Sequence, residues 1–485
     1  MASVVPLRRH RWWILAVIGA AQLMVVLDAT IVNIALPSAQ RDLGFGLNDR
    51  QWVVTAYSLA FGSLLLLGGR LGDMFGRRRT FIAGLVGFAL ASAFGGAAQS
   101  YGMLIAARAL QGAFGALLAP SALGLLTTTF SDQEDRGRAF AVFGGIASGG
   151  AAIGLLLGGM LTEWLSWRWC LYVNVLIAVP ATIGAALLIR TRAVAGAHTI
   201  DLPGALSASG GLFLLVYGFA HAETSSWTNA VTLGSLALGV VLLLVFVAIE
   251  SRVSAPLLPL RIVRDRNRGG AYLAILSGGL AMFAVFLFLT YYLQRTKGFS
   301  PIQTGLGFLP MVGALLFAAA ISNTRLLPRL GPRPIVPVGM ALGCVGMIML
   351  TRLGVSSTYA GTVLPALLVL GLAFGFAFAP SINTATAGLP PADAGVGSAV
   401  VNTCQQVGGS LGTAALSSIF ATALTRYAAA HPGPGALVKA TLHGYSTAFW
   451  TAAGIFAAGS IVTALMFRSG PLYAPAAAED AVVAG

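Results

Sequence analysis

Charged residues are scarce in this chain of 485 residues, since Asp, Glu, Lys and Arg together make up only 9% of it. A soluble domain usually carries about 25% charged residues, so this chain lacks the charge to cover a water-exposed surface. Its hydrophobic content of 57% also excludes an intrinsically disordered chain. The composition predicts a polytopic membrane protein and excludes most soluble enzymes.

Lysine is almost absent, which excludes a common route to ATP hydrolysis. A Walker A loop needs Gly-Lys, but Lys297 follows Thr296 and Lys439 follows Val438. The segment Gly408–Gly412 does match the G-x-S-x-G pattern of serine hydrolases. That pattern requires a strand–turn–helix context, whereas here it lies in an apolar run of helical length. We therefore expect no enzyme activity.

Cysteine is also rare, and Cys170, Cys344 and Cys404 lie in or beside apolar runs. Their spacing fits neither a metal site nor a disulfide framework, so we expect a packing role, no metal and no cofactor. The net charge of +14 does not indicate nucleic-acid binding. Basic residues gather in the cytoplasmic loops of membrane proteins, and no basic stripe interleaves with exposed aromatics.

Long apolar runs occupy most of the chain. A membrane-spanning helix needs about 20 mostly apolar residues, and the first run is too long for a cleaved signal peptide. The sequence predicts about fourteen spans, centred on residues 12–37, 51–69, 80–98, 102–128, 139–161, 169–189, 204–221, 229–249, 269–292, 301–321, 334–351, 360–379, 395–424 and 446–467. The longest breaks, near 190–203, 250–268 and 425–445, are expected to be loops.

The basic residues indicate an orientation. With Arg8, Arg9 and Arg11 placed in the cytoplasm, the inner loops hold most of the 29 Lys and Arg residues. This asymmetry supports an even number of spans with both chain ends in the cytoplasm. The loop 69–79 also has a degenerate echo at 325–333 on the same predicted side, and parallel repeats of this kind occur in transporters.

Asp28 is the acidic residue that lies well inside a predicted span, and Arg108 is the corresponding base. Such residues are costly in a membrane and indicate function, although Asp28 paired only for packing is the alternative. A rise of about 1.5 Å per residue places both at compatible depths in the outer half. We hypothesise that they interact, directly or through water. A positive neighbour favours the carboxylate and burial favours the neutral acid, and the sequence leaves that balance open.

Two predicted spans carry a polar stripe, and a third carries a glycine ridge. The polar faces consist of Arg108, Gln111, Gly112 and Gly115 on the fourth span, and of Asn402, Gln405, Gln406 and Gly409 on the thirteenth. A polar stripe lines a water-filled cavity or bonds to neighbouring helices. On the fifth span, Gly150, Gly154 and Gly158 favour close helix packing.

Several motifs together resemble those of the fourteen-helix drug:proton antiporters of the major facilitator superfamily, over nearly the whole chain. The matching segments are Leu27–Pro37, Gln51–Tyr57, Gly69–Arg79, Arg108–Gly112, and Trp167–Trp169 with Asn174. Two positions depart from the family pattern. Gly154–Gly159 lacks the proline of the fifth-helix antiporter motif, and Leu176 stands where proline is common. The missing proline removes a kink, whereas the glycine ridge survives.

The resemblance implies an all-α polytopic membrane protein with the major facilitator fold. It implies one six-helix bundle in residues 1–190, two inserted transmembrane helices in 191–267, and a second six-helix bundle with a short cytoplasmic tail in 268–485. It further implies alternating access driven by the proton gradient, with no cofactor. Asp28 would carry the proton or meet a cationic drug directly, and Arg108 would couple that protonation to the bundle.

The resemblance also implies three further groups of site residues. The substrate cavity would be lined by Asn33, Tyr57, Gln111, Phe286, Tyr291, Asn402 and Gln406. The cytoplasmic gate would consist of Gly69, Asp73, Gly76, Arg77 and Arg78, with a charged contact from Asp73 and Arg77 between the bundles, although its arginines also set topology. Close packing of the fifth helix would use Gly150, Gly154, Gly158 and Gly159.

These features predict proton-coupled efflux of amphipathic drugs or antibiotics across a bacterial cytoplasmic membrane, by a protein that works as a monomer in the lipid bilayer. An alternative of the same machinery is export of an endogenous metabolite or lipid. A non-transporting sensor or scaffold is a third reading, and the buried Asp28 argues against it because a scaffold needs no such acid.

Overall fold

The computed structural model describes residues 10–46, 49–130, 133–189, 201–253, 256–389, 394–433 and 435–470. Within these ranges the chain consists of helices joined by short connections and contains no strand. The prediction of an all-α protein is therefore confirmed.

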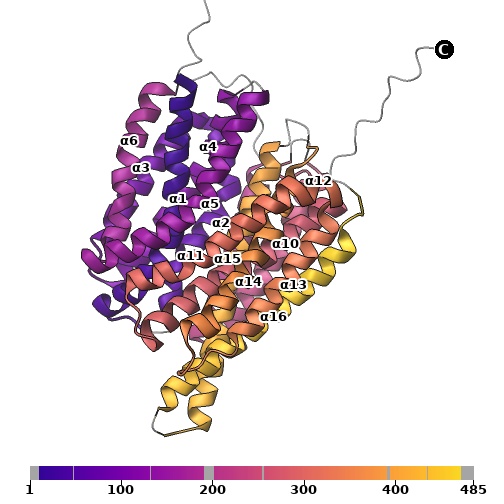
Figure 1. Cartoon of the computed structure of the whole chain (residues 1–485). Helices are drawn as coiled ribbons and strands as arrows, with labels where there is room; N and C mark the ends of the chain where they lie inside the picture. The colour runs from indigo at the N-terminus through magenta and orange to yellow at the C-terminus, as the bar shows by residue number, and fades with distance from the viewer. Residues whose placement is uncertain are drawn as a thin grey trace, which may run out of the picture.

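The N-terminal bundle holds six long helices, coloured indigo to magenta in Figure 1. They are α1 (His10–Leu43), α2 (Arg50–Phe75), α3 (Arg77–Gly96), α4 (Tyr101–Thr129), α5 (Gln133–Trp164) and α6 (Trp169–Leu188). Their shared core contains buried aromatic and aliphatic side chains such as Ile18, Met24, Phe61, Phe81 and Phe88. This core fixes the positions of the polar residues described below.

Two inserted helices, α7 (Leu202–Thr224) and α8 (Ala230–Glu250), pack against each other. α7 also packs against α2 of the first bundle and α15 of the second, so the pair contacts both. α8 leaves aliphatic side chains such as Leu233, Val241 and Leu244 exposed. An apolar outer surface of this kind suits contact with lipid.

The C-terminal bundle follows the short α9 (Leu260–Arg264). It contains α10 (Arg266–Tyr291), α11 (Pro301–Ile321), α12 (Leu327–Leu330), α13 (Pro332–Leu350), α14 (Leu364–Thr386), α15 (Ala394–Ala430) and α16 (Ala436–Met466). Short π-helical turns extend α10, join α11 to α12 and precede α14. The boundary predicted between residues 267 and 268 falls in the first turn of α10.

The described helices account for the predicted spans. Thirteen of them are long and apolar enough to cross a membrane, by length and composition. The fourteenth, α2, has 26 residues but includes Gln51, Arg70 and Asp73. It packs against α4, α7 and α15, so most of its surface meets protein, where polar residues are better tolerated than against lipid.

The prediction of a loop over residues 425–445 is wrong for most of that segment. α15 continues to Ala430 and α16 begins at Ala436. The apolar runs end near Arg426 and Lys439, but a charge indicates where the hydrocarbon region ends and does not stop a helix. Figure 1 shows the resulting hairpin projecting beyond the other helices at the lower end of the molecule.

The two bundles are in close contact at the end predicted to be extracellular. A methyl group added to Gly159 of α5 would lie 2.8 Å from the Cα atom of Ile302 of α11. The backbone N–H of Ile302 donates to the Glu163 carboxylate at 3.1 Å. Gln294 Nε2 donates to the carbonyl of Ile34, also at 3.1 Å. These contacts join α5 to α11 and α1 to the turn after α10.

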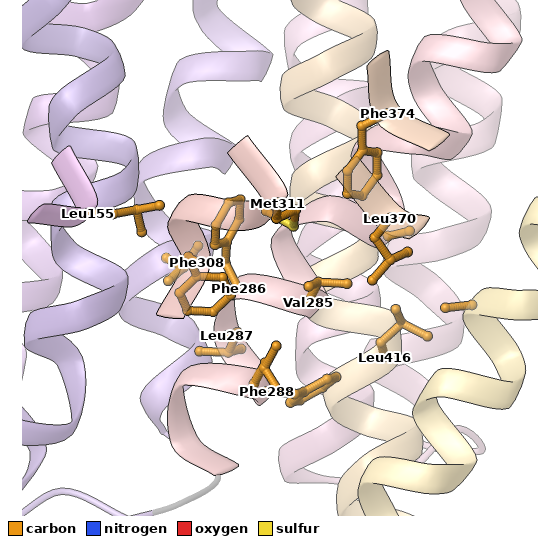
Figure 2. Packing of buried hydrophobic residues seen from close by; sticks show 14 of the residues in the cluster. Leu155, Val285, Phe286, Leu287, Phe288, Phe308, Met311, Leu370, Phe374 and Leu416 are labelled. Atoms are coloured by element: carbon orange, nitrogen blue, oxygen red, sulfur yellow. The ribbon is translucent and has the colours of Figure 1, made fainter. Parts of the chain in front are cut away.

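Farther along α5, toward the end predicted to be cytoplasmic, the surroundings differ. A methyl group added to Gly145 or Gly149 would meet open space, as would one on Gly313 of α11. Closer to the contact region, Figure 2 shows the Leu155 side chain of α5 directed toward Phe286 and Phe308 of the C-terminal bundle. The contacts between α5 and α11 named above therefore lie toward one end of the two helices.

Candidate functional site

A buried carboxylate lies at the centre of the N-terminal bundle. Asp28 of α1 is fully buried, with 0% of its surface exposed. Its Oδ2 atom accepts a hydrogen bond from Arg108 Nη1 at 2.6 Å. Its Oδ1 atom accepts from Gln111 Nε2 at 2.9 Å and from Asn174 Nδ2 at 2.8 Å. Side chains from α1, α4 and α6 thus converge on one acid.

The Arg108 guanidinium is held by groups besides Asp28. Its Nε donates to the carbonyl of Val53 at 3.0 Å, and its Nη1 donates to Gln111 Oε1 at 2.8 Å. The guanidinium carbon also lies 4.4 Å from the centre of the Tyr57 ring, within the range of a cation–π interaction. Contacts to the backbone and side chains of α2 therefore fix the position of this buried charge.

Helix geometry explains how the sequence builds this network. Arg108 and Gln111 are three residues apart, so they share one face of α4. Gly112 follows on that face, and a side chain there would overlap the carbonyl of Tyr57. The absence of a side chain lets α4 approach α2 closely. Gln111 Nε2 reaches Ser92 of α3 at 2.7 Å, which adds another helix to the site.

The energetics of the pair favour a functional role over a stabilising one. A buried ion pair contributes little net stability compared with apolar packing, whereas removal of one partner costs about 3–5 kcal/mol. A need for stability alone therefore does not explain why Asp28 and Arg108 are buried in this bundle. An ionised Asp28 accepts all three of these hydrogen bonds, and adding a proton would turn one acceptor into a donor. The arrangement can respond chemically to a single proton.

A small cavity lies on the extracellular side of Arg108, inside the N-terminal bundle. Its lining is almost wholly apolar and consists of Val32, Ala35, Leu36, Ala39, Val53, Leu104, Trp167, Cys170 and Leu171 together with Arg108. Apolar side chains therefore lie between Arg108 and the end predicted to be extracellular.

The residues predicted to line a substrate cavity fall into separate places. Tyr57 and Gln111 belong to the Asp28 network. Phe286 is buried against Phe308, with ring centres 5.1 Å apart, and Tyr291 lies under Arg50. Asn33 lies on α1, as Asp28 does, and donates to the carbonyl of Ala29. Asn402 and Gln406 lie on α15 of the other bundle. Asn402 donates to the carbonyl of Ser398, and the half-buried Gln406 lies beside Gly62 of α2.

The predicted gate residues lie where α2 turns into α3. Gly76 adopts φ +90°, a backbone conformation that favours glycine, between the two helices. Arg77 Nη1 donates to the Gly124 carbonyl at 2.8 Å, and Arg78 Nη2 donates to the Ala186 carbonyl at 2.7 Å. These hydrogen bonds stay within the N-terminal bundle. Gly69 lies against Pro120, and the side chain of Asp73 is outside the described residues, so the lock between bundles stays a prediction.

The glycines of α5 lie against two different helices. Added methyl groups at Gly150, Gly154 and Gly158 would meet side chains or backbone of α1. An added methyl at Gly159 would instead meet α11 of the other bundle. One ridge therefore serves packing within the first bundle and the contact between bundles.

Sequence reasoning missed three residues that the structure brings into play. Ser92 and Asn174 complete the Asp28 network, and Asn174 appeared only as part of a family motif. The available signal was a polar residue within an apolar run, and the structure shows that both side chains are fully buried. Arg50 lies just outside the predicted span 51–69, where a charge is expected in a loop, but it is the first residue of α2 and is buried.

Fold and site together define a membrane transporter of known architecture. The model of the Major Facilitator Superfamily matches residues 18–413, and the chain belongs to this superfamily. It is 48% identical over 463 residues to a puromycin resistance protein of Streptomyces alboniger, covering 95% of this chain and 92% of that protein. It is 40% identical over 407 residues to a cephamycin export protein of Amycolatopsis lactamdurans, covering 82% and 83%.

A further relative is a tetracenomycin C resistance and export protein of Streptomyces glaucescens, 34% identical over 417 residues, which cover 86% of this chain and 77% of that protein. Among solved structures, the POT family transporter PepTSo has a TM-score of 0.69 at 15% identity and covers 94% of this chain and 97% of its own. A bacterial homologue of the human lysosomal transporter Spinster has a TM-score of 0.64 at 14% identity, with coverages of 95% and 97%. At these identities the structural likeness supports the fold alone.

Proposed function

We propose that this protein exports amphipathic antibiotics across the bacterial cytoplasmic membrane in exchange for protons. The observation that carries the proposal is the fully buried Asp28, held by Arg108, Gln111 and Asn174. An ionisable residue inside a membrane bundle indicates a proton or ion pathway. The antibiotic class comes from the relatives, whose names state resistance to or export of puromycin, cephamycin and tetracenomycin C.

The exchange works by alternating access of the two bundles. The contacts of Gly159 and Gln294 join the bundles at the predicted extracellular end, which supports an inward-facing starting state. Substrate enters from the cytoplasm while Asp28 is protonated, and proton release on that side restores the Arg108 pair. The bundles then rock about the substrate, which leaves outside as Asp28 takes up a new proton.

The remaining features of the proposal follow from this cycle. The proton gradient supplies the energy, so no cofactor is required. Both chain ends lie in the cytoplasm, as the distribution of arginines favours. The Asp28 network lies wholly within the N-terminal bundle of one chain, so the proposed cycle needs no second copy and the protein works as a monomer.

Transport into everted membrane vesicles tests the proposal. Vesicles energised to an acidic lumen are given puromycin, a cephamycin or ethidium, and lumenal alkalinisation is followed with a pH-sensitive dye. We expect substrate-dependent proton efflux from wild type and its loss in Asp28→Asn. Asp49→Asn is the matched control, because that acid precedes α2, outside the Asp28 network, and its carboxylate accepts from the backbone N–H of Gly46. Undiminished coupled export by Asp28→Asn, at equal protein in the membrane, contradicts the proton role.

A further inference from the structure

An aromatic cage surrounds a buried arginine at the extracellular contact between the bundles. Arg50 is 3% exposed. Its guanidinium carbon lies 4.1 Å from the ring centre of Tyr291, 5.0 Å from that of Phe420 and 5.9 Å from that of Phe288. The buried Tyr445 side chain lies beside the same group and packs against Phe420, with ring centres 5.0 Å apart. We call these four aromatic residues the aromatic cage.

The cage and its occupant come from opposite bundles. Arg50 begins α2, whereas the cage residues lie on α10, α15 and α16. Among the described residues no carboxylate forms an ion pair with Arg50, and its buried Nη2 has no hydrogen-bond partner. Burying a charge without an opposite charge is costly. The aromatic faces must therefore supply much of the compensation, as desolvated cation–π contacts can.

We propose that the aromatic cage is a binding site for an organic cation on the exit route, and that Arg50 is a tethered competitor for it. The proposal rests on the alternating access proposed above. In the present conformation Arg50 fills the cage. When the bundles separate at the extracellular end, α2 carries Arg50 away, and the cage faces the opened cavity. A cationic substrate then binds there, and the return of Arg50 displaces it outward.

The chemistry of the cage defines the class of ligand. Aromatic faces attract weakly hydrated cations such as quaternary ammonium groups or guanidinium groups. With no carboxylate in the cage, the hold on such a cation is moderate. Arg295 follows Tyr291 by four residues, in the π-helical turn that extends α10, and because it belongs to the same bundle as the cage it stays when α2 withdraws. Its repulsion favours release of the cation, which suits a site used on the way out.

Equilibrium binding of ethidium to the purified full-length protein tests the proposal. Removing the tethered competitor in Arg50→Gln should raise the affinity for ethidium about tenfold, since the site no longer exchanges one cation for another. The double variant Arg50→Gln/Tyr291→Leu should lose that gain, because leucine keeps apolar bulk without an aromatic face. Arg41→Gln is the matched control, since Arg41 is exposed and bonds only Ser38 of its own helix.

Three outcomes overturn the inference. They are an unchanged affinity in Arg50→Gln, a gain that persists in the double variant, and an equal gain for an uncharged ligand such as tetracenomycin C. Should Arg50→Gln fail to fold, Phe420→Leu in the presence of Arg50 must weaken ethidium binding while leaving the uncharged ligand unaffected, and equal weakening of both also overturns it. Binding at equilibrium needs no proton gradient, so this result is independent of the Asp28→Asn transport experiment.

Discussion

Gly159 of α5 and Ile302 of α11 lie so close that a methyl group on Gly159 would be 2.8 Å from the Ile302 Cα atom. The atoms around it are backbone atoms, which cannot move aside as a flexible side chain can. Only glycine allows this approach of the two bundles. The glycine ridge of α5 therefore bears directly on closure of the extracellular side.

A Gly159→Val variant should fail to close at the extracellular end and should lose at least tenfold in export rate, because valine would overlap the α11 backbone. Spin labels at Trp164→Cys and Val355→Cys, in a background without the three native cysteines, should report a longer separation. Gly145→Val is the control, since an added side chain there meets open space. A label separation unchanged by Gly159→Val would contradict the proposed role.

Asn174→Ala should reduce coupled export about tenfold at neutral pH. The substitution removes a donor to the Asp28 carboxylate, and a hydrogen bond to a charged group contributes about 1.5–3 kcal/mol. Initial rates of export in vesicles, at equal protein in the membrane, measure the loss. Ser92→Ala should reduce the rate less, because Ser92 bonds to Gln111 and reaches Asp28 through it. The opposite ranking would count against the network.

The charge of the substrate should decide how transport depends on membrane potential. Exchange of one proton for a monovalent cation moves no net charge, whereas exchange for a neutral substrate moves one. A potential of 100 mV acts on that charge with about 2.3 kcal/mol, roughly a fifty-fold gradient. Collapsing the potential with valinomycin and potassium should slow export of a neutral antibiotic and spare that of ethidium. Equal inhibition of both would exclude one-for-one exchange.

Replacing Ser410 with alanine should leave export within about twofold of wild type. Its hydroxyl donates to the Gln406 carbonyl one turn earlier in α15, so the G-x-S-x-G pattern here is a helical segment. The neighbouring Gly408 lies against the Leu276 carbonyl of α10, and Gly408→Val should sharply reduce folded protein in the membrane. Protein quantity and vesicle export distinguish the two effects. Loss of activity in folded Ser410→Ala would reopen a chemical role for the serine.

The positions of the helices could be predicted because a membrane-spanning helix imposes a long apolar run, which the sequence displays directly. Asp28 and Arg108 could be singled out because charge inside such a run is rare. Arg50 could not, since it stands at the end of a run and looks like any loop charge. Its burial depends on aromatic residues from more than two hundred positions later, and only the packing of the bundles brings them together.

The same limit applies to Ser92 and Asn174. A serine or an asparagine in an apolar helix can bond its own backbone, face a neighbour or reach a distant acid. Choosing among these requires the rotation of each helix about its axis. The prediction of a loop at residues 425–445 was wrong for a different reason. Hydropathy indicates contact with lipid and carries no information on how far a helix continues into water.

The bond from Arg108 to the Val53 carbonyl has an electrostatic consequence. With Asp28 ionised, the pair is neutral as seen from the rest of the protein. A proton on Asp28 leaves one positive charge that α2 holds in place. At about 10 Å and an effective dielectric constant near 20, this charge repels a second cation by about 1.7 kcal/mol, more than tenfold in occupancy. Under the proposed exchange, a proton and a cationic antibiotic would thus exclude each other through the field of a fixed arginine, without ever sharing an atom.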